Sequence, residues 1–174
     1  VLLAYLGDWE GAEVRMAQLR PRLAVPGQHN QLGAWFAAIS TLEAAAVLGL
    51  RETCAELYPQ ALQLHEDGAY IVWDRGLSER QAAIAAAAGS RWDVAEGHFA
   101  GAETRARDGG NRLELAELTR WRAQMLLWRD EGEDRVQARE LLAQAARAYR
   151  ELHMVRHVRF TEELTVEALG PVSR

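Results

Sequence analysis

The sequence predicts an all-α protein, a right-handed α-solenoid of antiparallel helix pairs with about eight helices. Ala, Leu, Glu, Arg and Gln are plentiful, and these side chains lose little rotamer freedom in a helix. Thr, Ile and Phe are scarce, which leaves little from which to build a sheet. A turn, a helix start and an alanine recur together, and Ala12, Ala55, Ala95 and Ala138 are spaced by 43, 40 and 43 residues. This period is typical of stacked helical hairpins, each of which needs neighbours to bury its apolar face.

The helices are placed in order by their start and stop signals. Residues 1–6 read as the end of a first helix, which Gly7 terminates. Glycines such as Gly49, Gly89 and Gly110 provide the left-handed conformation with which helices end. The predicted helices cover residues 8–20, 31–48, 51–66, 77–88, 91–108, 112–129, 135–152 and 155–168. In the second helices of the pairs, the trios Ala12-Met16-Leu19, Ala95-Phe99-Ala102 and Ala138-Leu142-Ala145 each lie on one helical face.

Side-chain caps are predicted at Ser78, Asn111 and Asp134, because Gln or Glu follows each of them three residues later. Pro59 falls inside the helix expected over 51–66, so we expect a kink near Tyr58. Residues 69–76 are apolar and partly β-branched between two glycines, and they break the helical pattern. They form either an extended loop packed along the array or a loop that contacts a ligand.

One continuous domain over residues 1–174 is predicted, because no segment rich in Pro, Gly or Ser divides the helices. The chain begins within an apolar stretch and without methionine, so we expect it to be a fragment of a longer protein. The net charge of −5 argues against direct binding to nucleic acid or to an anionic membrane. No apolar run is long enough to span a bilayer. The single Cys54 fits a reducing compartment, which favours the cytoplasm.

The absence of lysine excludes several kinds of chemistry, since all 20 basic residues are arginine. A phosphate-binding loop with its lysine, a pyridoxal Schiff base and a lysine general base cannot lie in this segment. No catalytic residue and no cofactor is predicted. His153 and His157 have the four-residue spacing of a metal site. A helix–helix turn is expected at Met154 and would separate the two rings, so no metal is predicted either.

The stretch Gly7-Asp8-Trp9-Glu10-Gly11-Ala12 resembles the loop and second-helix start of tetratricopeptide repeats. The period exceeds the usual one of about 34 residues, so the repeats look like a long-helix variant. Residues 77–169, most clearly 77–154 with the stretches 91–99, 138–145 and 150–154, resemble the carboxy-terminal repeats of large bacterial signalling ATPases. Those proteins carry a nucleotide-cyclase domain or a LuxR-type DNA-binding domain. The resemblance covers roughly the whole chain and implies a non-catalytic region for sensing and interaction.

Aromatic and arginine side chains on the first helices are the candidates for ligand contact. In helical arrays the first helices line the concave side, where aromatic rings and guanidinium groups suit a peptide carboxylate, a phosphate or a sugar. Packing against the next repeat is the competing role for the same rings. The groove candidates are Trp35, Trp73, Arg80, Trp121, Arg122 and Trp128.

The function predicted from the sequence is a protein-interaction or effector-sensing module of a larger bacterial signalling or transcription regulator. Its partner would be a protein, a peptide or neighbouring domains of the parent chain, and self-association is possible. The first alternative is a small-molecule-binding sensor with a pocket near residues 69–76 that includes Trp73. The second alternative is an α-helical enzyme of unknown type.

Overall fold

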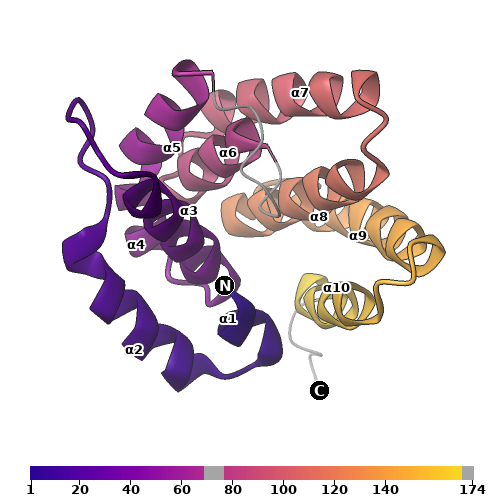
Figure 1. Cartoon of the computed structure of the whole chain (residues 1–174). Helices are drawn as coiled ribbons and strands as arrows, with labels where there is room; N and C mark the ends of the chain where they lie inside the picture. The colour runs from indigo at the N-terminus through magenta and orange to yellow at the C-terminus, as the bar shows by residue number, and fades with distance from the viewer. Residues whose placement is uncertain (69–76, 170–174) are drawn as a thin grey trace. The chain divides into compact units, whose positions relative to one another are not determined.

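The structure is a computed structural model that describes residues 1–68 and 77–169, and this part of the chain is helical (Figure 1). The predicted all-α class is therefore confirmed. The helices are α1 (Leu2–Leu6), α2 (Trp9–Leu19), the 3₁₀-helix η1 (Arg20–Arg22), α3 (Leu32–Val47), α4 (Arg51–Glu56), α5 (Tyr58–Glu66), α6 (Ser78–Ala88), α7 (Trp92–Asp108), α8 (Arg112–Arg129), α9 (Asp134–Glu151) and α10 (Val155–Ala168). Among the described residues, no helix is long and apolar enough to cross a bilayer.

The chain divides into two compact units, Val1–His98 and Phe99–Arg174, with the boundary inside α7. The expectation of one domain over 1–174 stays a prediction.

In the first unit, α3 is the central element and packs against α1, α2, α4, α5 and α6. Every residue of α6 is buried. A helix surrounded on all sides needs small or apolar residues around its whole circumference, and the run Ala82–Ala88 supplies them with one Ile among six alanines. Small side chains also let neighbouring helices approach closely. The polar residues of α6 are confined to its first turn.

In the second unit, α9 packs along α8 on one side and along α10 on the other (Figure 1). Ala116, Ala145 and Tyr149 form its core cluster. The predicted face Ala138-Leu142-Ala145 of α9 is buried, as is the face Ala95-Phe99-Ala102 of α7. The helical spacing therefore identified the buried side of both second helices correctly.

The same turn joins helices at five places. A residue with positive φ lies at Gly7, Gly49, Ser90, Gly110 and His153. The amide of the next residue then donates to the carbonyl five positions back, as in Asp8 to Leu3, Leu50 to Ala45, Arg91 to Ala86, Asn111 to Ala106 and Met154 to Tyr149, at 2.8–3.0 Å. This bond is the one that defines a Schellman C-terminal motif. The turns at Gly7, Gly49 and Ser90 join α1 to α2, α3 to α4 and α6 to α7, each time the first helix of a pair to the second. The turns at Gly110 and His153 join α7 to α8 and α9 to α10, each time a second helix to the first helix that follows it.

The turns correct the predicted register of the second repeat. In each of the three turns that lead from a first helix to a second, the carbonyl of the residue that directly follows the left-handed position accepts a hydrogen bond from a backbone amide four residues later. The donors are the amides of Ala12, Cys54 and Ala95. Cys54 is fully buried, whereas Ala55 is only half-buried. The matching residue is therefore Cys54, and the prediction of Ala55 was wrong by one position. Burial raises the pKa of the Cys54 thiol to about 12, so this side chain acts as a small apolar residue.

The predicted kink at Pro59 is confirmed, because α4 ends at Glu56 and α5 begins at Tyr58. Proline is tolerated in the first turn of a helix, where its missing N–H would have no partner in any case. The cap at Asn111 is also confirmed, since its Oδ1 accepts the Glu114 amide at 3.0 Å. The cap at Ser78 was wrong: α6 starts after Leu77, and Ser78 is a buried residue of its first turn.

Asp134 also differs from its predicted role as a cap. It is the first residue of α9 rather than the residue before it. Its carboxylate accepts two hydrogen bonds from Arg129, at 2.7 and 2.8 Å, and one from the Glu131 amide at 3.0 Å. The bonds from Arg129 hold the pKa of Asp134 below its ordinary value. Asp134 therefore fastens the loop between α8 and α9.

Candidate functional site

Polar side chains are buried mainly on the first helices of the pairs. They are Thr41 and Glu43 on α3, Ser78, Glu79, Arg80 and Gln81 on α6, and Glu114, Glu117, Arg120 and Gln124 on α8. Burial of such groups is costly unless they are hydrogen-bonded. The second helices bury mostly alanine and other apolar residues. Most of the buried polar side chains therefore lie on α3, α6 and α8.

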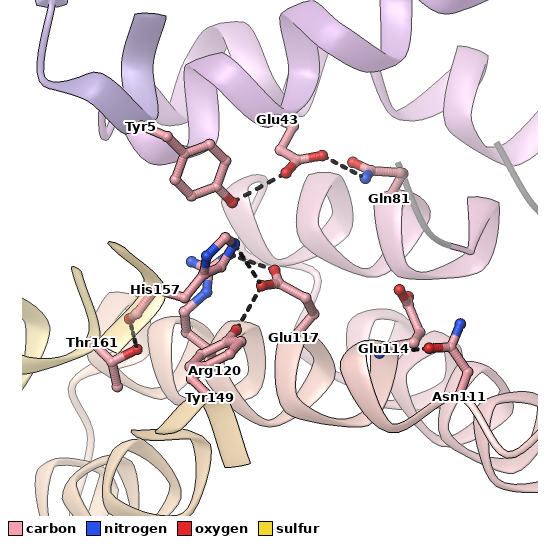
Figure 2. A network of polar contacts seen from close by, with 10 residues as sticks. All are labelled: Tyr5, Glu43, Gln81, Asn111, Glu114, Glu117, Arg120, Tyr149, His157 and Thr161. Atoms are coloured by element: carbon pink, nitrogen blue, oxygen red, sulfur yellow. Dashed lines mark hydrogen bonds and ion pairs between the residues drawn. The ribbon is translucent and has the colours of Figure 1, made fainter. Parts of the chain in front are cut away.

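In the first unit, the Glu43 carboxylate connects three helices (Figure 2). Its Oε1 accepts the Tyr5 hydroxyl of α1 at 3.1 Å, and its Oε2 accepts the Gln81 side-chain amide of α6 at 3.0 Å. Glu43 itself lies on α3. Both carboxylate oxygens thus accept a hydrogen bond from a residue on another helix. The three first helices of this unit are held to one another through a single side chain.

In the second unit, the Glu117 carboxylate of α8 plays a similar part (Figure 2). Its Oε1 accepts the Tyr149 hydroxyl at 2.6 Å, and its Oε2 accepts the Arg120 guanidinium at 2.8 Å. His157 Nε2 lies 3.5 Å from Oε1. Burial, together with the charge of Glu117, raises the pKa of Tyr149, so the phenol keeps its proton and remains a donor. Glu117 therefore connects α8 with α9 and α10.

These two networks suit the positioning of helices better than acid–base chemistry. A general acid or base needs an oxygen that can reach a substrate proton. In both glutamates each oxygen already accepts a bond from the protein. The Arg120 guanidinium also lies 4.1 Å from the centre of the Trp121 ring and 5.2 Å from that of Phe160. The Glu117 carboxylate and these aromatic rings therefore both stabilise the Arg120 charge inside the protein.

The candidate residues predicted from the sequence differ in exposure. Arg80 is 3% exposed and Trp121 is 1% exposed. Trp35, Arg122 and Trp128 are half-buried. Trp73 and the proposed pocket at 69–76 lie outside the described residues. A partner that binds this conformation thus has access to Trp35, Arg122 and Trp128, whereas Arg80 and Trp121 are covered by the protein itself.

The three candidates of the second unit, Trp121, Arg122 and Trp128, all lie on α8. The rings of Trp121 and Trp128 are 6.5 Å apart between centroids, at 48°. Arg122 bonds Glu103 of α7 at 3.3 Å, and its guanidinium lies 5.7 Å from the centre of the Phe99 ring. Arg122 therefore joins α8 to the second part of α7 while a share of its side chain still faces solvent.

The networks around Glu43 and Glu117 were missed by the sequence analysis. A signal was present for Glu43, which stands alone between apolar residues over 42–48. For Glu117 the signal was weaker, because charged residues are frequent along α8. Their partners Tyr5, Gln81 and Tyr149 are more than thirty positions away in the chain. Spacing along one helix cannot reveal such contacts.

A cavity of about 310 Å³ opens in the first unit between α1, α2 and α3. Its wall is mainly apolar, with Leu3, Met16 and Leu19, and Arg15 and Thr41 add polar atoms. The Thr41 hydroxyl is buried and has no hydrogen-bond partner among the described residues. The residues that line this cavity fall within 1–41, whereas the pocket predicted from the sequence was placed near 69–76.

The two histidines considered as a metal pair have separate structural roles. His153 occupies the left-handed position of the turn between α9 and α10. The His157 ring packs against Tyr149, with centroids 5.1 Å apart, and belongs to the Glu117 network.

Comparison of the chain with protein-family models, with curated proteins and with solved structures gave no match.

Proposed function

We propose that this chain is a non-catalytic helical-repeat module for protein interaction or effector sensing, part of a larger bacterial signalling or transcription regulator. In this proposal the helix pairs are tetratricopeptide-like and stack as a right-handed α-solenoid. The observation that carries it is the recurrent turn at Gly7, Gly49 and Ser90, with its identical hydrogen bonds. A repeated connection between repeated helices is the local unit from which solenoids are built.

The packing of the first unit supports the same proposal. The first helix α3 contacts the first helices α1 and α6, and it also contacts α4, the second helix of its own pair. Neighbouring repeats in a solenoid contact each other in this manner. A surface made of such helices is preformed, so binding avoids much of the entropy cost of ordering loops. A protein, a peptide, or neighbouring domains of the parent chain would bind it.

On each unit by itself, the proposed contact residues are those of the predicted set that remain accessible. Trp35 serves in the first unit, and Arg122 and Trp128 serve in the second. Aromatic and arginine side chains dominate the binding energy of many interfaces. Arg122 presents a planar guanidinium that can bind a carboxylate through two parallel hydrogen bonds.

The test is selection of peptides from a displayed random library on the purified chain, followed by titration of the best sequences by fluorescence anisotropy. We expect saturable binding and a loss of about tenfold in affinity for Arg122→Ala, which corresponds to about 1.4 kcal/mol. The Tm should change little, because the ion pair between Arg122 and Glu103 is partly exposed to solvent. The side chain of Arg122 is 28% exposed and that of Glu103 is 29% exposed.

Arg147→Ala is the matched control, since Arg147 is an exposed arginine on α9 of the same unit. Its affinity for the selected peptides should equal that of the unmodified chain. The proposal fails if no sequence is enriched, or if Arg122→Ala and Arg147→Ala weaken binding equally.

A further inference from the structure

Two histidines and a glutamate from three different helices converge in the first unit. They are His65 in the last turn of α5, Glu79 in the first turn of α6 and His98 of α7. One ligand atom from each lies within 4.8 Å of the other two. None of the three belongs to the Glu43 network or to the predicted groove residues. Because these residues are far apart in the sequence, their convergence is a product of the tertiary fold.

The contacts inside this group are not those of an ordinary hydrogen-bonded cluster. His65 Nε2 and Glu79 Oε1 are 3.7 Å apart, which is longer than a hydrogen bond. His65 Nδ1 is buried and has no hydrogen-bond partner among the described residues. The rings of His65 and His98 meet edge to face with centroids 6.0 Å apart. The three ligand atoms thus lie close together, and the contact between His65 and Glu79 is too long for a hydrogen bond.

We propose that His65, Glu79 and His98 form a binding site for one Zn²⁺ ion. Two imidazole nitrogens and a carboxylate oxygen are a ligand set that zinc accepts, with bonds of about 2.0–2.1 Å. Tetrahedral ligand atoms would then lie about 3.3 Å from one another. His65 Nε2 and Glu79 Oε1 are 3.7 Å apart and all three ligand atoms lie within 4.8 Å of one another, so the side chains would have to rotate toward one another to bind the ion. Water fills the fourth position, as in zinc sites with three protein ligands.

The surroundings favour zinc over the hard cations. Mg²⁺ and Ca²⁺ prefer six or more oxygen ligands, whereas imidazole nitrogens suit zinc. The side chains of His65 and Glu79 are only 16% and 9% exposed, so little water competes for the ion. Burial lowers the pKa of His98, with smaller contributions from His65 and Arg91 and an opposing one from Glu66.

Tyr58 supports the site from the start of α5. Its hydroxyl lies 3.2 Å from His98 Nε2, and the guanidinium of Arg91 lies 3.6 Å from the centre of its ring. The Tyr58 hydroxyl limits rotation of the His98 ring, and Arg91 holds the Tyr58 ring in place. A metal ion at this site would join α5, α6 and α7 within the unit.

The test uses the whole chain with any histidine tag removed and freed of metal by chelation. Equilibrium dialysis against Zn²⁺ should give one ion per chain, and the bound ion should raise the Tm by a few degrees because it binds the folded state. Co²⁺ in its place should give the intense visible bands of four-coordinate cobalt with nitrogen and oxygen ligands. His65→Gln and His98→Gln should each weaken Zn²⁺ binding by about 100-fold or more.

His29→Gln is the control, since His29 is an exposed histidine in the same unit, and it should bind Zn²⁺ as the unmodified chain does. Glu79→Gln keeps the side-chain volume and tests the site if a histidine variant does not fold, as judged by circular dichroism without metal. The proposal is overturned if dialysis finds no stoichiometric Zn²⁺, if Co²⁺ remains six-coordinate, or if His29→Gln weakens binding as strongly as His98→Gln.

Discussion

At the scale of single residues, the main feature of this protein is that charged side chains lie inside it and are bonded there. Glu43 and Glu117 each bond to donors on other helices. Replacing a buried ion pair by apolar residues is often neutral, but removing one partner is strongly destabilising. The two carboxylates therefore fix which helices meet, while the alanine-rich surfaces around them supply apolar burial.

Glu117→Ala should lower the free energy of unfolding by about 3–5 kcal/mol, because it removes the buried carboxylate that accepts hydrogen bonds from Arg120 and Tyr149. Urea unfolding monitored by circular dichroism measures the change. Glu151→Ala provides the comparison, since Glu151 pairs with Arg112 at 2.7 Å but both side chains are about two-thirds exposed. That surface pair should contribute less than about 1 kcal/mol. Equal losses for the two variants would contradict a stabilising role for the Glu117 network.

At the scale of elements, several of the helices are joined by the same kind of turn. Five turns share one hydrogen-bond pattern, yet three of them use glycine at the left-handed position and two use serine or histidine. A residue with a Cβ pays about 1–2 kcal/mol in that conformation. Ser90 compensates in part, because its hydroxyl accepts a bond from Arg51 at 3.0 Å. His153 therefore marks a position where the local sequence does not favour the conformation that the fold requires.

His153→Gly should raise the free energy of unfolding by about 1 kcal/mol, since glycine adopts a φ of 58° without steric strain. Gly110→Ala, at the matching turn of the same unit, should lower it by a similar amount. Thermal and urea unfolding of the two single variants measure the increase in stability expected for His153→Gly and the decrease expected for Gly110→Ala. If His153→Gly proved destabilising, a contact of the histidine ring rather than backbone strain would govern this turn.

At the scale of the whole chain, burial is distributed unevenly within each unit. In the first unit α6 is buried throughout, whereas α1 and α2 each bury a single alanine, Ala4 and Ala12. Trp9 of α2 is 58% exposed. Helices with few buried contacts open locally at low free energy. The first unit therefore has a rigid centre at α3 and α6 and a weakly held edge.

Amide hydrogen exchange followed by mass spectrometry should show this gradient. Peptides from 2–19 should exchange at least about tenfold faster than peptides from 78–88, because a difference of 1.4 kcal/mol in opening free energy already gives that factor. Peptides from the exposed end of α10 provide an internal reference for fraying in the second unit. Uniform exchange along 1–98 would mean that the first unit opens only as a whole.

The sequence by itself determined the helical class, the helix boundaries to within a few residues, the break at Pro59 and the cap at Asn111. Those features depend on residues within one or two helical turns, where backbone propensity and capping act. Only the tertiary structure decided that Cys54 rather than Ala55 faces inward, that Trp121 and Arg80 are buried, and that His65, Glu79 and His98 meet. Burial and convergence depend on helices that are distant along the chain, and neither spacing nor propensity carries that information.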